Sequence, residues 1–94
     1  MNNMSWSQFQ TQASDQGYTE CLQKVWDADL VLDTHTHPFA VWARVDAGEM
    51  WLSHGGHTHH LKAGDVFSLD ADVPHQERYG DSAVTVWIAR RHPA

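Results

Sequence analysis

The chain has 94 residues, with 6 Lys or Arg against 12 Asp or Glu and a net charge of −6 at pH 7. This length predicts one domain with a small core, and so few basic residues exclude a nucleic-acid-binding surface. No segment predicts a transmembrane helix or a signal peptide, and the single Cys21 cannot form an internal disulfide, so we expect a cytoplasmic protein that does not engage a membrane.

Residues 5–16 have the pattern of a short amphipathic helix. Ser5 stands as an N-cap, and Gln8 completes the form of a capping box. Apolar residues follow at helical spacing, and Gly17 is a natural stop. These apolar residues are Trp6, Phe9 and Ala13. We expect the helix to cover one edge or end of the domain.

After this helix, short β-forming segments alternate with turn residues. Strands are predicted at residues 18–26, 30–37, 41–46, 49–54, 57–61, 66–69, 75–79 and 84–90. Val41, Ala43 and Val45 share one strand face, which predicts that this face lies in a core. So many short strands with one helix predict an all-β sandwich or barrel.

Two histidines stand two residues apart in the predicted strand 30–37. Residues two apart in a strand point to the same face, so His35 and His37 can bind one metal ion together. Pro38 favours an extended backbone at His37. The pair is therefore a candidate for two ligands of a metal site that needs a third, and the alternative is two ordinary surface histidines.

The spacing of histidines and glycines resembles the two sequence motifs of the cupin family. In the first motif, His-x-His is followed by a glutamate and then a glycine. His35 and His37 match it, with Val41 at the glutamate position and Gly48 at the glycine. The missing carboxylate is a departure from the family pattern.

The second motif runs from a glycine through a proline region to a histidine. Gly64, Pro74 and His75 match it, while Asp70 and Asp72 stand where the family has its internal proline and glycine. The resemblance covers residues 30–90. It implies a single cupin domain over residues 1–94, with the helix inside residues 1–17 and a jelly-roll antiparallel β-barrel as the core.

By this resemblance, His35, His37 and His75 form a three-histidine site for one divalent metal ion, such as iron, zinc, nickel or manganese. Without the carboxylate the centre is more positive, which favours a small anionic or enolisable ligand. Cupins of this kind include iron-dependent dioxygenases, so one expectation is a dioxygenase-like or other metal-dependent enzyme. A non-catalytic module that binds or senses a small molecule is the alternative, and a metal-free barrel is a third possibility.

Further residues are candidates around this site. Glu77 shares a strand face with His75 and is a candidate replacement carboxylate or catalytic base, and Asp33 is a candidate to orient an imidazole. Val41 and Tyr79 are predicted to line the pocket. The apolar interior is expected from Val41, Ala43, Val45, Val84, Val86 and Ile88. The resemblance and the small core also predict a homodimer.

A second group of histidines surrounds the two-residue loop Gly55-Gly56. The loop places His54 opposite His57, and His57 and His59 share a face. With His60, this group is either a second or adventitious metal site or a solvated hairpin tip. Cys21 is expected to be a packing residue, with a redox role as the alternative.

Overall fold

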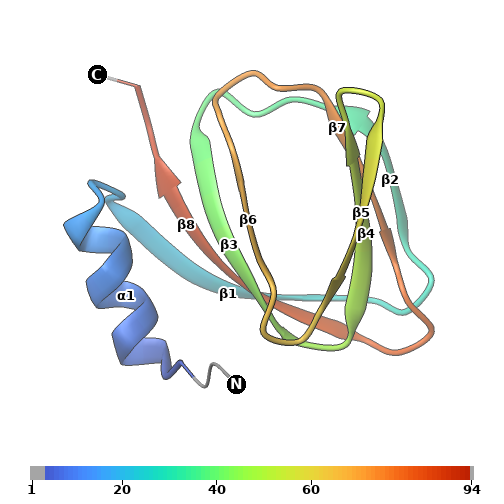
Figure 1. Ribbon diagram of the computed structural model, residues 1–94, viewed down its shortest axis with the longest axis horizontal. Coiled ribbons are helices and arrows are strands. Elements are labelled where there is room, and N and C mark those ends of the chain that lie inside the picture. The colour runs from blue at the N-terminus through green and yellow to red at the C-terminus, as the bar shows by residue number, and fades with distance from the viewer. Residues whose placement is uncertain (1–3, 94) are drawn as a thin grey trace.

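In the computed structural model, which describes residues 4–93, the chain forms one helix and eight strands (Figure 1). The elements are α1 (Trp6–Asp15), β1 (Glu20–Trp26), β2 (Val31–His35), β3 (Ala40–Ala47), β4 (Glu49–His54), β5 (His57–Lys62), β6 (Val66–Leu69), β7 (His75–Tyr79) and β8 (Val84–Arg91). Every predicted strand is present, with bounds that differ by about two residues or fewer. Residues 1–3 and 94 of the predicted domain lie outside the described part. The described residues contain no helix long and apolar enough to cross a membrane.

The strands form two four-stranded antiparallel sheets that face each other (Figure 1). One sheet has the order β1-β8-β3-β6, and the other has the order β2-β7-β4-β5. Each sheet contains strands that are far apart in the sequence, as in a jelly roll. The predicted all-β jelly-roll fold is therefore confirmed, with the barrel built as a sandwich of two sheets.

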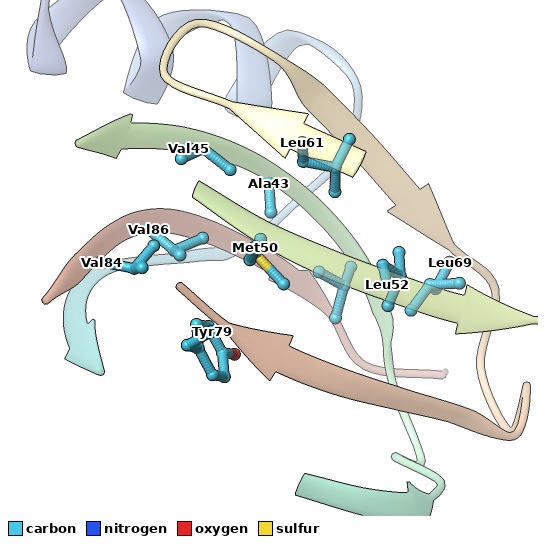
Figure 2. Close-up of a cluster of buried hydrophobic side chains, with 10 residues drawn as sticks. Ala43, Val45, Met50, Leu52, Leu61, Leu69, Tyr79, Val84 and Val86 are labelled. Atoms are coloured by element: carbon cyan, nitrogen blue, oxygen red, sulfur yellow. The ribbon is translucent and has the colours of Figure 1, made fainter. Parts of the chain in front are cut away.

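The core lies between the sheets, where apolar side chains from both inner faces meet (Figure 2). Ala43 and Val45 on β3, Met50 on β4 and Val84 on β8 are all 0% exposed. Burial of each larger apolar side chain contributes about 1.5–3 kcal/mol. The predicted interior is confirmed, since its residues belong to this core or pack against it.

Helix α1 packs on the outer face of the β1-β8-β3-β6 sheet, not on an edge or an end as the sequence suggested (Figure 1). Its capping box is present: Ser5 Oγ accepts from the Gln8 N–H, and Gln8 Oε1 accepts from the Ser5 N–H. The buried ring of Phe9 stacks on Trp42 of β3 at 4.6 Å and meets the edge of Trp87 of β8. The two tryptophans make this outer face apolar, and the helix shields it from water.

Candidate metal site

The three predicted metal ligands come from the ends of two paired strands. His35 is the last residue of β2, His75 is the first residue of β7, and the two are directly opposite in the ladder. His37 lies two residues beyond the end of β2, so it is placed by the segment that follows the hydrogen-bonded strand. The ladder is irregular between Leu32 and His35, and the His37 carbonyl accepts from the Asp72 N–H at 2.8 Å instead of continuing the strand.

His35, His37 and His75 nevertheless converge, and we call them the three-histidine cluster. Each offers one ring nitrogen, and these three atoms lie within 4.8 Å of one another. The ring centroids are 4.3 Å apart for His35 and His75 and 5.1 Å apart for His37 and His75. In the part of the chain that the structure describes, no other group of His, Cys, Asp or Glu has this geometry.

Two backbone carbonyls fix the orientation of the imidazoles. His35 Nδ1 lies 2.7 Å from the Asp33 carbonyl oxygen, and His75 Nδ1 lies 2.9 Å from the Val73 carbonyl oxygen. A carbonyl oxygen only accepts, so in both rings Nδ1 carries the hydrogen, and in the neutral form of each ring Nε2 has a lone pair for a metal. The role predicted for Asp33 is thus performed by its backbone oxygen.

The environment of His37 favours its neutral form. Burial lowers the pKa of this imidazole from the ordinary value of 6.5, and nearby positive charge lowers it further. In order of effect, these charges belong to His75, His35, Arg90 and Lys24. A histidine binds a metal only when it is neutral, so this shift favours metal binding.

The loop before β7 holds the cluster together. Asp72 occupies the position where the family motif has a glycine, and its φ of +66° is the left-handed conformation that glycine favours. Asp is one of the few other residues that tolerate this conformation. Asp72 therefore adopts a conformation that glycine favours, and its N–H donates the hydrogen bond to the His37 carbonyl.

A cavity of about 100 Å³ opens between the sheets beside the cluster. Val41 lines it, as predicted, and so does Glu77, whose Oε2 lies 3.5 Å from His35 Nε2. Tyr79 lies in the core instead, 1% exposed, and its hydroxyl donates to Glu77 Oε1 at 3.1 Å. Burial, together with the Glu77 charge, raises the pKa of Tyr79 far above its ordinary value, so it stays a donor.

Sequence reasoning missed seven residues that line this cavity, namely Lys24, Trp26, Leu32, Phe39, Phe67, Leu69 and Arg90. A signal for Arg90 was present, because it continues the two-residue alternation of Val86 and Ile88 toward the interior. The positive charge of Arg90 was the only reason not to predict it in the interior.

The second histidine group does not form a comparable cluster. His54 is opposite His57, as predicted, and its ring lies 5.3 Å from that of His59. His60 points to the other face, where it stacks on Trp51 at 4.5 Å. Cys21 is half-buried, and burial, with the charge of Glu20, raises the pKa of its thiol, which disfavours a reactive thiolate.

Comparison with known proteins identifies the family. A family model described as an AraC-like ligand binding domain matches residues 17–92. The chain belongs to this family. A comparison of this AraC-like domain with curated protein sequences found no match.

Solved structures similar to the AraC-like domain share the cupin fold that the motifs predicted. DMSP lyase DddQ from Ruegeria pomeroyi has a TM-score of 0.69 and 25% identity over 76% of this chain and 36% of that chain. The Cnp3 cupin domain of Schizosaccharomyces pombe has a TM-score of 0.71 and 12% identity over 78% and 52%. A mutant of salicylate 1,2-dioxygenase from Pseudoaminobacter salicylatoxidans has a TM-score of 0.66 and 18% identity over 74% and 20%. The AraC-like domain thus spans about half or less of these chains.

Proposed function

We propose that this AraC-like domain binds one divalent metal ion through His35, His37 and His75 and uses it to hold a small molecule in the adjoining cavity. The observation that carries this proposal is the orientation of the rings. His35 and His75 each give their Nδ1 hydrogen to a backbone carbonyl, which leaves Nε2 free for a metal. Such a hydrogen bond behind the ligating nitrogen is a regular feature of metal-binding histidines.

The donor set suits a divalent transition metal. Three neutral imidazoles bind zinc, iron, nickel or manganese, and three protein ligands leave positions open for water or a ligand. Bound there, such a metal would supply Lewis-acid chemistry, and iron or manganese would add redox chemistry. The chain itself supplies an apolar wall around these positions, with Val41 where related cupins have a carboxylate.

Catalysis is the second candidate, and Glu77 is the observation that favours it. This carboxylate lines the cavity beside the three-histidine cluster, and the Tyr79 hydroxyl holds it in place. A carboxylate so placed can take a proton from a molecule bound in the cavity. The similar solved structures include a lyase and a dioxygenase, which supports the same candidate. The predicted homodimer and cytoplasmic location stay predictions.

Elemental analysis of the purified, untagged protein tests the proposal. We expect about one divalent metal ion per chain in the wild type, and its loss in His75→Ala. His57→Ala, in the second histidine group, is the matched control and should keep the metal. Equal metal content in wild type and His75→Ala, or no binding after reconstitution, would overturn the site. If the metal is iron, oxygen uptake with thiols or diketones separates an enzyme from a binding module.

A further inference from the structure

Two cationic side chains line the cavity together with the three-histidine cluster. They are Lys24 of β1 and Arg90 of β8. In the ladders, Lys24 is directly opposite Val86 and Arg90 is directly opposite Val41, and both of these apolar residues also line the cavity. Directly opposite residues share a sheet face, so both cations belong to the inner face. Lys24 is exposed and its Nζ lies over the Trp26 ring, which places it on the solvent side of the cavity.

Arg90 is held in position but keeps hydrogen-bonding capacity. Its guanidinium lies 4.8 Å from the ring centroid of Phe39, which in turn stacks on His37 at 4.9 Å. Among the described residues, its hydrogen bond is from Nη1 to Glu20 Oε1 at 3.1 Å, and its buried Nε has no partner. A guanidinium has five N–H donors in a planar fork that fits a carboxylate. Most of these donors therefore stay available.

The charges around the cavity do not balance once a metal is bound. Glu20 and Glu77 carry two negative charges, which offset Lys24 and Arg90 but leave the divalent metal uncompensated. The position of the family carboxylate is Val41, and its partner across the ladder is the cation Arg90. An apolar wall strengthens the electrostatic attraction for an anion. An anionic ligand would supply the missing negative charge.

We propose that the cavity binds a small carboxylate, whose carboxylate group is held by Arg90 while a second polar atom of the same molecule reaches the metal, and that Lys24 adds positive charge on the solvent side of the cavity. This inference rests on the proposed metal site. The cavity of about 100 Å³ is smaller than the roughly 150 Å³ that admits benzene, so the part of the ligand inside it has about six non-hydrogen atoms or fewer. A short hydroxy or oxo acid has this size and this pair of polar groups.

The test is a titration of the cobalt(II)-loaded protein with lactate, followed by the visible absorption of the cobalt. Lactamide, a neutral molecule of the same size, is the control ligand. With cobalt kept saturating for every variant, we expect Arg90→Gln to raise the lactate dissociation constant about tenfold or more and Lys24→Gln to raise it by a smaller factor, while the weak response to lactamide stays unchanged. Arg78→Gln is the matched control variant, because Arg78 stacks on Trp51 instead of lining the cavity.

The outcomes separate this inference from the proposed metal site. Failure of the wild type to bind cobalt would overturn the metal site and the inference with it. If cobalt binds but lactate gives no response, or an equal response in wild type and both cavity variants, only the carboxylate site is overturned. Arg90→Lys keeps the charge but loses the planar fork, so its lactate affinity should fall between wild type and Arg90→Gln. This variant also guards against a loss of affinity that comes from misfolding.

Discussion

His37 is the ligand whose position depends least on regular secondary structure. It follows the end of β2, and its backbone is fixed by one hydrogen bond from the loop before β7. Its ring is fixed by stacking on Phe39 at 4.9 Å. The same surroundings that place the ring also remove it from water and put it near positive charge. Its protonation is therefore coupled to folding.

This coupling predicts how the metal-free protein responds to acid. The pKa of His37 is lowered in the folded chain, so as pH falls below about 6.5 the unfolded chain takes up a proton that the folded chain does not. The free energy of unfolding should therefore fall as the pH is lowered from 7.5 to 5.5. His37→Asn removes this contribution and should show a shallower decrease, measured by urea unfolding in the presence of a chelator. Parallel curves for the two proteins would contradict the prediction.

At the scale of elements, α1 is a cover for one face of a sheet that is apolar on both sides. Trp42 and Trp87 project away from the core and would meet water without the helix, and Phe9 and Ala13 fill the space over them. The three-histidine cluster lies between the sheets, on the other side of β3 and β8. A substitution in the helix should therefore lower the stability of the fold without changing the affinity for metal.

Phe9→Ala tests this separation. Removal of a ring that is 0% exposed should lower the free energy of unfolding by about 3–5 kcal/mol. The exposed position Gln12 on the same helix provides the control, since Gln12→Ala should change stability by less than about 0.5 kcal/mol. Metal affinity of the folded Phe9→Ala protein, measured by titration at low temperature, should match that of the wild type. A loss of metal affinity would show that the helix supports the site.

The elements were largely predictable, because the two-residue alternation and the turn residues are local signals. The alternation of Val41, Ala43 and Val45 identified the core face of β3, and the capping box identified the start of α1. The second face of β3 was not predictable in the same way. Trp42 and Arg44 resemble a solvated face in the sequence, and only the contact of Trp42 with Phe9 shows that this face is covered.

At the scale of the whole molecule, the site combines residues from both sheets. The motif spacing predicted the three histidines, since motifs encode which strand ends meet. Lys24 and Arg90 belong to the opposite sheet, and no motif includes them. Their approach to the histidines depends on how the sheets pack, which is a tertiary property. Tyr79 was predicted to line the pocket. It does point to the inner face of β7, but it lies in the core and not at the cavity.

The arrangement of the cluster across two distant segments predicts that a bound metal stabilises the fold. The ligands lie at the end of β2 and the start of β7, so a metal ion would join them only in the folded chain. At a free metal concentration about 100 times the dissociation constant, binding adds about 2.7 kcal/mol. For a domain of this size that is a rise of roughly 10–20 °C in the midpoint of thermal unfolding.

Thermal unfolding of the same protein with and without metal measures this rise, followed by circular dichroism. Each variant is compared with its own metal-free form, because loss of the buried His75 ring changes the baseline stability by itself. The rise should vanish in His75→Ala and persist in His57→Ala. A rise of equal size in both variants would mean that the metal acts elsewhere, with the second histidine group as the first place to look. A rise in His57→Ala that is absent in His75→Ala would show that the metal stabilises the sandwich through the three-histidine cluster, which joins the end of β2 to the start of β7.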